Sequence, residues 1–321
     1  MKKSLLALAV LAAFAGAASA QSSVTLYGRV DLSVGKNAGA KDKFLANGSG
    51  SRLGVRGVED LGGGLKALFN VEHRFNADTG ANTAGMTPTS RFWHGRSIVG
   101  LQGGFGQVTL GRDYTTSFLQ SQLVADPWGL DTVSANTAIV TGGIGTVRND
   151  STITYRLTTG GFAVGAQVAE ATDAINNTPN KPMNFAVSYA GGPLTIGFGH
   201  ERPGSEAAAS AKWTTVNAAY SLGPVTLGGF FGTGNTAADA KVRSYLVSAV
   251  ATMGQGELRA SFGRLQSDPA GASPRVTTAQ LTSVGYHYSL SKRTTLYADV
   301  VNNSKAATSK TGYDFGIKHN F

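Results

Sequence analysis

Six arginines and three aspartates are the residues of this chain whose type and position could do chemistry. An arginine guanidinium stays charged at any working pH and presents a rigid set of donors to anions. The three acids fall within one long connection, residues 113–148. Acids that face arginines across a narrow passage would create a transverse electric field that orients polar solutes. The arginines are Arg29, Arg52, Arg56, Arg74, Arg96 and Arg148, and the acids are Asp113, Asp126 and Asp131.

No other set of residues in the sequence fits a catalytic or metal-binding pattern. The five histidines are not spaced as metal ligands, and cysteine is absent. The segment "HERPG" (200–204) begins like a zinc-protease motif but lacks the second histidine, and "GGIGTV" (142–147) has no strand–helix context for a dinucleotide. No motif supports a Ser-His-Asp site. We therefore expect no enzyme, no metal and no cofactor.

The first twenty residues predict a cleaved secretory signal peptide. A Lys-Lys pair at 2–3 precedes a short apolar stretch, and Ala-Ser-Ala at 18–20 supplies a small-residue cleavage site. The mature chain would begin at Gln21, and its net charge falls from +9 to +7. The remaining basic residues are scattered rather than clustered in a run, which argues against a nucleic-acid partner. Because an exported chain without cysteine has no disulfides, its stability must come from elsewhere.

Apolar and polar residues alternate with period two through the mature sequence. The pattern is clear in "VTLYGRVDLSVG" (24–35), "LKALFNVEHRF" (65–75) and "YDFGIKHNF" (313–321). Strands with this pattern have one apolar face and one wet face. Short glycine-rich or tight turns alternate along the chain with longer polar segments. The short turns lie at 61–64, 102–104, 159–161, 191–193, 222–224, 253–256 and 290–293.

Seven short turns divide the chain into eight strand–loop–strand units, which predicts an all-β fold of sixteen strands. Strands of about ten residues cross a bilayer when tilted. The sheet must then close, because an unpaired backbone polar group in lipid is energetically costly and a closed sheet leaves no unpaired edge. A propeller blade packs four strands into about 40–45 residues, and sandwich strands are about five or six residues long. We therefore predict a transmembrane antiparallel β-barrel over residues 21–321, with short periplasmic turns and long extracellular loops.

The chain resembles the Gram-negative general diffusion porins of the β-proteobacterial type. The resemblance covers the whole mature chain. In the family's Arg-x-x-Asn-Ser pattern, Ser151 and Thr152 stand here where Asn and Ser are usual. The stretches that carry the resemblance are "SSVTLYGRVDLSV" after the cleavage site, "GSRLGVRGVEDLGGGLKALFNVE" (50–72), "RSIVGLQGGFGQVTLGRDY" (96–114), "RNDSTITY" (148–155) and the terminal "YDFGIKHNF".

The resemblance implies where the chain resides and what it meets. It implies a homotrimer in the Gram-negative outer membrane, in contact with outer-membrane lipid and lipopolysaccharide. Phe321 would be the terminal aromatic residue that the barrel-assembly machinery recognises. Segment 113–148 would be the third loop, folded inward as a constriction loop.

Strand arginines have little choice of direction in such a barrel. A charge on the lipid face costs roughly 2–4 kcal/mol at mid-depth, so these side chains point into the lumen. Arg56, Arg96 and Arg148 match the family's motif positions, and we predict them as the leading residues of the basic wall.

The predicted function is passive diffusion of small hydrophilic solutes and ions, with a weak preference for anions. Two alternatives remain open at this stage. One is a channel specific for anions such as phosphate or organic acids, which needs a saturable site. The other is an occluded, adhesin-type outer-membrane barrel. Single-channel conductance separates the three.

Overall fold

The computed structural model describes residues 22–82, 91–169, 172–173, 178–179, 181–204, 211–268 and 275–321. The predicted signal peptide, residues 1–20, lies outside the described residues. Within those ranges no helix is both long and apolar enough to cross a membrane.

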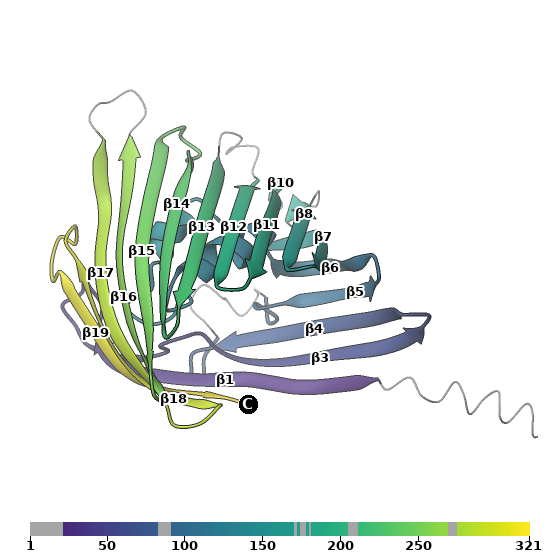
Figure 1. The fold of residues 1–321 in the computed structure, drawn as a ribbon, viewed down its shortest axis with the longest axis horizontal. Coiled ribbons are helices and arrows are strands. Elements are labelled where there is room, and N and C mark those ends of the chain that lie inside the picture. The colour runs from purple at the N-terminus through teal and green to yellow at the C-terminus, as the bar shows by residue number, and fades with distance from the viewer. Residues whose placement is uncertain are drawn as a thin grey trace, which may run out of the picture.

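Sixteen long antiparallel strands of the described chain form one closed sheet, as predicted (Figure 1). Each long strand pairs with the next, and the last pairs with the first. Three further strands are short: β2 (Phe44–Ala46), β9 (Thr172–Asp173) and β10 (Thr178–Pro179). The long strands are β1 (Ser23–Lys36), β3 (Ser51–Gly62), β4 (Leu65–Phe75), β5 (Ser97–Gly103), β6 (Gly106–Tyr114), β7 (Arg148–Thr159), β8 (Phe162–Val168), β11 (Met183–Gly191), β12 (Leu194–Arg202), β13 (Lys212–Leu222), β14 (Val225–Asn235), β15 (Lys241–Met253), β16 (Gly256–Asp268), β17 (Val276–Ser289), β18 (Thr294–Asn303) and β19 (Thr311–Asn320).

The barrel closes where the two ends of the mature chain meet. β1 pairs with β19 from Arg29 opposite Asn320 to Lys36 opposite Tyr313. Beyond that register the terminal Phe321 exchanges two backbone hydrogen bonds with Gly28, at 2.9 and 3.1 Å. The phenyl ring lies where a Cβ on Gly28 would be, 2.4 Å from its Cζ atom. A side chain at position 28 would therefore collide with the terminal aromatic residue.

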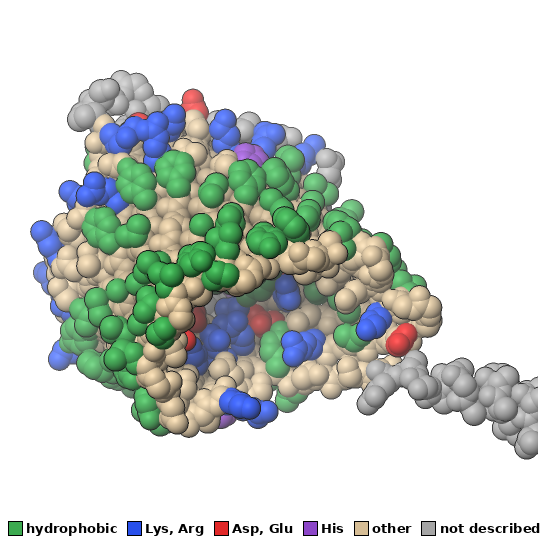
Figure 2. Space-filling view, viewed as in Figure 1, with side chains coloured by type: hydrophobic (Ala, Val, Ile, Leu, Met, Phe, Trp, Pro, Cys, Tyr) green, Lys and Arg blue, Asp and Glu red, His purple; other side chains and the backbone are tan. Residues whose placement is uncertain are grey.

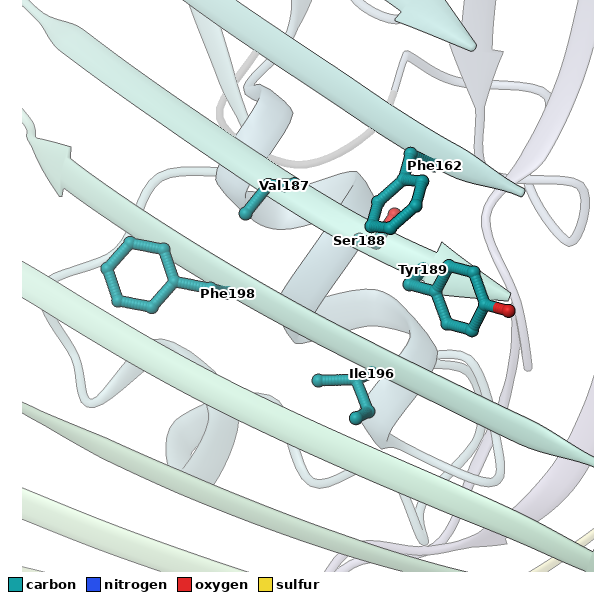
Figure 3. A pocket seen from close by; sticks show the side chains of 6 residues that line it. All are labelled: Phe162, Val187, Ser188, Tyr189, Ile196 and Phe198. Carbon is teal, nitrogen blue, oxygen red and sulfur yellow. The ribbon is translucent and has the colours of Figure 1, made fainter. Parts of the chain in front are cut away.

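Outward-facing side chains are apolar and inward-facing ones are largely polar, which confirms the predicted alternation. Leu110 and Val247 are 50% and 58% exposed on the outer surface. Figure 3 shows part of this surface, with Phe162, Tyr189 and neighbouring apolar side chains on the outer face of β8, β11 and β12. The Phe162 and Tyr189 rings lie 4.8 Å apart on this surface.

The long connection between β6 and β7 folds against the inner wall of the barrel. It contains a π-helical turn η2 (Phe118–Gln122), a 3₁₀ turn η3 (Leu123–Ala125) and the helix α2 (Thr137–Thr141). The helix buries Ile139 and Val140 against Phe230 and Leu246 of the wall. Trp213 Nε1 donates to the carbonyl of Val140 at 2.9 Å. The inward fold of the constriction loop is thereby confirmed.

The predicted ends of the constriction loop need a small correction. β6 runs through Tyr114, so Asp113 belongs to the strand and the loop spans 115–147. At the start of β7, Ser151 takes the left-handed conformation with φ of 53°, next to a register shift in the β6–β7 pairing. Asn favours this conformation more than Ser does, which gives a physical reason for the family's Asn at this position.

Candidate functional site

A row of three arginines crosses the inner wall of the barrel. The strand register sets Arg29 of β1 opposite Arg52 of β3, and Arg52 opposite Arg74 of β4. The three side chains therefore lie side by side on neighbouring strands. Figure 2 shows the opening of the lumen, where basic and acidic side chains gather while hydrophobic ones cover the outer wall. The sequence predicted that these arginines face inward, and the register adds that they are neighbours across the strands.

Each arginine of the row is held differently. Arg29 Nη1 contacts Asp131 Oδ2 of the constriction loop at 3.0 Å, and its Nε donates to Asn320 Oδ1 at 2.9 Å. Arg74 Nε pairs with Glu72 Oε1 at 2.9 Å. Arg52 donates from Nε to the carbonyl of Gly50 at 3.0 Å and has no ion pair among the described residues. Arg52 thus carries the row's uncompensated charge.

Tyr114 joins the row to two further arginines. Its hydroxyl accepts from Arg74 Nη2 at 2.8 Å and from Arg148 Nη2. The guanidinium carbons of Arg148 and Arg96 lie 4.0 and 5.2 Å from the centre of the tyrosine ring. The ring also stacks on Phe118 of the loop, with centroids 5.8 Å apart. A π face attracts cations, so this one side chain holds like charges close together.

Replacing Tyr114 by phenylalanine should destabilise the barrel while keeping the ring. Two hydrogen bonds to charged donors would be lost, each worth about 1.5–3 kcal/mol. We expect a lower free energy of unfolding in urea for Tyr114→Phe. The matched control is Tyr155→Phe, because the Tyr155 hydroxyl donates at 2.7 Å to the carbonyl of Phe105, an uncharged acceptor at an exposed turn. Equal losses in the two variants would show that Tyr114 has no special role.

Asp113 is part of the wall and not of the facing loop. Its carboxylate is fully buried and pairs with Arg96 Nε and Arg156 Nη1, both at 2.7 Å. It therefore fixes the two arginines in place, and its own charge is compensated. Arg96 and Arg148 both lie in the cluster around Tyr114, whereas Asp113, predicted as a loop acid, belongs to strand β6.

Arg56 is set apart from the other predicted arginines. It lies four residues from Arg52 towards the periplasmic end of β3, opposite Asn70. Its guanidinium carbon is 5.2 Å from the centre of the Tyr27 ring, and its side chain is exposed. The structure brings Arg29, Arg52, Arg74, Arg96 and Arg148 together and leaves Arg56 nearer the periplasmic mouth.

The two remaining loop acids have different partners. Asp131 faces the wall and pairs with Arg29, as the prediction of opposed charges requires. Asp126 instead ties the loop to itself, accepting from Leu130 N at 2.8 Å and from Asn136 Nδ2 at 2.8 Å. Burial raises the pKa of Asp126, and the loop donors oppose that rise. Asp126 therefore stabilises the fold of the loop through hydrogen bonds within it and does not contact the basic wall.

Lowering the pH should strengthen any anion preference of the passage through Asp131. Burial raises the pKa of its carboxyl above 3.8, while Arg29, Lys318 and Arg52 oppose the rise and Asp31 adds to it. Protonation removes one negative charge, so chloride permeability relative to potassium should increase as the pH falls from 7 towards 4. Zero-current potentials at a series of pH values measure this. Asp131→Asn should show the high ratio at every pH, and a persistent pH step in that variant would contradict the assignment.

The corner of the constriction loop is bound to β18, two strands along the sheet from β1 and the arginine row. Trp128 is 3% exposed, and its Nε1 donates to Asp299 Oδ1 at 2.7 Å. His287 Nε2 lies 3.1 Å from the same carboxylate oxygen. At the far end of the loop, Glu201 accepts from Gln122 Nε2 at 2.5 Å and from the Thr146 amide at 2.9 Å. Two buried acids of the barrel wall thus hold the loop: Asp299 binds its corner, and Glu201 binds residues near both of its ends.

Several of these functional side chains were not predicted. Tyr114, Arg156, Asp299 and Glu201 lie at inward positions of their strands. Inward parity was a usable signal for Arg156, Asp299 and Glu201, but parity does not tell which inward residue meets the loop. Tyr114 shares the parity of the outward Leu110 and turns inward next to the register shift after Gly111. Among the described residues no group of three His, Cys, Asp or Glu side chains could hold a metal. Burial and nearby arginines, Arg112 first, lower the pKa of His94 to about 4, so this histidine is neutral at pH 7.

Comparisons with known proteins point to one family. The family model described as Gram-negative porin matches residues 7–307. Outer membrane porin protein 32 of Delftia acidovorans is 34% identical, and an outer membrane porin protein of Bordetella pertussis is 30% identical, each over 100% of both chains. Among solved structures, the anion-selective porin from Comamonas acidovorans superimposes with a TM-score of 0.75 at 29% identity. That match covers 94% of this chain and 100% of the other.

Proposed function

The chain belongs to the Gram-negative porins, and on this premise we propose that arginines at its constriction make the channel weakly anion-selective. As an outer-membrane porin it is a passive diffusion channel for small hydrophilic solutes. The observation that carries the proposal is the row Arg29–Arg52–Arg74, in which one arginine has no acid partner among the residues that the structure describes. The anion-selective relative from Comamonas acidovorans supports the same preference.

The preference follows from the balance of charge at the narrow part of the lumen. Six arginines gather there with four carboxylates, those of Glu72, Asp113, Asp131 and the buried Asp31, which binds the same Ser49 hydroxyl as Arg29. At an effective dielectric constant near 20, unit charges about 4 Å apart interact by about 4 kcal/mol. A passing anion is stabilised by part of this energy and a cation is destabilised by it, while the loop acids that face the arginines limit the stabilisation of the anion. Passage therefore stays fast, and no tight site forms at the row. The arginines are Arg29, Arg52, Arg74, Arg96, Arg148 and Arg156.

The assembly and its partners are part of the proposal. We propose a homotrimer, which the resemblance to the family implies, set in outer-membrane lipid and lipopolysaccharide. The barrel-assembly machinery would recognise Phe321, whose ring packs on Gly28 at the closing seam. The proposal of a channel, rather than an occluded adhesin, rests on family membership and on the charged opening in Figure 2.

Single-channel recording of the reconstituted protein tests the proposal. Large ohmic steps, grouped in threes for a trimer, are expected, together with an anion preference that weakens between about 0.1 M and 1 M KCl. Screening is the reason, since the Debye length falls from about 10 Å to about 3 Å over that range. An absence of steps would support the occluded barrel. A preference that does not depend on salt would contradict an electrostatic origin.

A further inference from the structure

A polar cavity of about 560 Å³ opens below the constriction loop, on the periplasmic side of the arginine row. Its wall is built from β16, β17, β18 and β19 and from the two short turns that join β15 to β16 and β17 to β18. Short turns mark the periplasmic rim of the barrel. The cavity is therefore the last compartment that a solute entering from outside meets, after it has passed the constriction.

The cavity is lined by three cations and one carboxylate. Arg259, Lys292 and Lys318 supply the positive charge, and Glu257 supplies the negative charge. Arg259 Nη2 pairs with Glu257 Oε2 at 2.6 Å, so one cation is compensated. Lys292 and Lys318 have no ion pair among the described residues. Hydroxyl groups of Ser289, Ser291, Thr252 and Thr295 complete a lining that suits oxygen-rich anions.

Arg259 connects this cavity to the constriction loop. Its Nη1 donates to the carbonyl of Pro127 at 3.0 Å, next to the Trp128 side chain that is docked on Asp299. The Nε of Arg259 is buried and has no hydrogen-bond partner within the described part of the chain. A buried donor without a partner is costly, and an anion in the cavity or a bridging water would satisfy it.

The strand register places the cavity beside the arginine row, and its turn residues extend it to the short-turn rim. Lys318 of β19 lies opposite Asp31 of β1, two residues from Arg29 on that strand, and opposite Thr295 of β18. Side chains two residues apart on a strand share a face. Lys318 therefore lies beside Arg29 on the inner wall, and Lys292 extends the cavity from there to the short-turn rim.

We propose that this cavity is a binding site for a small divalent oxyanion, such as hydrogen phosphate or a dicarboxylate, on the exit side of the constriction. The charged groups of its lining, three cations and Glu257, sum to +2, which matches a charge of −2. Chloride carries half that charge and cannot use several hydroxyl donors at once. The site rests on the proposed anion preference, since the anion must first pass the arginine row, and it would slow divalent oxyanions on their way into the periplasm.

The test is block of the single-channel chloride current by inorganic phosphate, with succinate as a second probe. In the wild-type protein each probe should reduce the current in a saturable way, more strongly from the short-turn side. Lys292→Gln and the double variant Lys292→Gln/Lys318→Gln should raise the half-blocking concentration, the double variant by about tenfold or more. Lys305→Gln is the matched control, because Lys305 is an exposed lysine between β18 and β19 at the opposite rim. Phosphate and succinate should block the current of this variant as they block that of the wild type.

Each outcome of this experiment decides the matter. The site is supported by a saturable block that is weaker in the cavity variants and unchanged in the control. Block by only one of the two probes shows whether the site takes phosphate or a dicarboxylate. An anion-preferring channel without saturable block would overturn the site alone. An equal loss of block in Lys305→Gln would also overturn it. A cation-preferring wild-type channel would overturn the proposed function instead, so the two failures can be told apart. Lys292 lies in an exposed turn, so its single variant keeps the test open if the double variant does not fold.

Discussion

Replacing Arg52 by glutamate should reduce the anion preference of the channel more than any other single change at the row. The substitution changes the local charge by two units and breaks no ion pair of the described residues, because the Nε of Arg52 donates only to the carbonyl of Gly50. For an ion about 8 Å away in water, each unit of charge contributes about 0.5 kcal/mol. Screening at about 0.1 M salt leaves less than half of this. We therefore expect the chloride-to-potassium permeability ratio to fall about fivefold.

The control for Arg52→Glu is the same change at Arg56. Both residues lie on β3 and both face the lumen, but they are four residues apart, or about 13 Å along a strand. That separation exceeds the Debye length at about 0.1 M salt. Arg56→Glu should therefore alter the permeability ratio less than Arg52→Glu does. If the two variants changed the ratio equally, or if Arg56→Glu had the larger effect, the assignment of the selective charge to the row would be wrong.

Replacing Trp128 by alanine should release the corner of the constriction loop and widen the passage. The tryptophan is almost fully buried and supplies the donor to Asp299. Truncation of a buried tryptophan costs about 3–5 kcal/mol, while much of the remaining loop is held through Asp126 and α2. We expect higher single-channel conductance, more current noise, and faster liposome swelling with larger sugars.

Trp93→Ala serves as the control for Trp128→Ala. Trp93 is the same residue type in another loop, is 39% exposed, and contacts Phe92 edge to face. Its removal should leave conductance and the size limit for sugars unchanged. A Trp128→Ala channel with wild-type conductance would show that the corner does not set the width of the passage.

The barrel could be predicted from the sequence because its determinants are local and periodic. A period-two pattern, short glycine turns and strand length each depend on neighbouring residues, and lipid allows few architectures that satisfy them. The prediction failed for Asp113 and Asp126, two of the three acids assigned to the loop, because the partners of such acids depend on how the loop itself folds. Asp126 was expected to face arginines, yet its donors, Leu130 and Asn136, are within ten residues in the same loop.

The wall that receives the loop was also missed, for a physical reason. Trp213, Phe230 and Leu246 point inward and are buried, although the alternation rule assigns inward positions to polar residues. They are apolar because the constriction loop covers this part of the lumen and excludes water. Consecutive apolar residues on these strands, such as Phe230 next to Phe231, are a sequence signal of a strand buried on both faces. The alignment of Arg29, Arg52 and Arg74 across neighbouring strands depends on register, which turn lengths and a bulge determine.

The most direct measurement of the central claim is the zero-current potential of the wild-type channel across a tenfold KCl gradient at low ionic strength. A basic row with one uncompensated arginine predicts a potential whose sign shows chloride to be the more permeant ion. The size of this potential should decrease as the mean salt concentration rises. A potential of the opposite sign, showing preference for potassium, would contradict the claim that the arginine row governs passage.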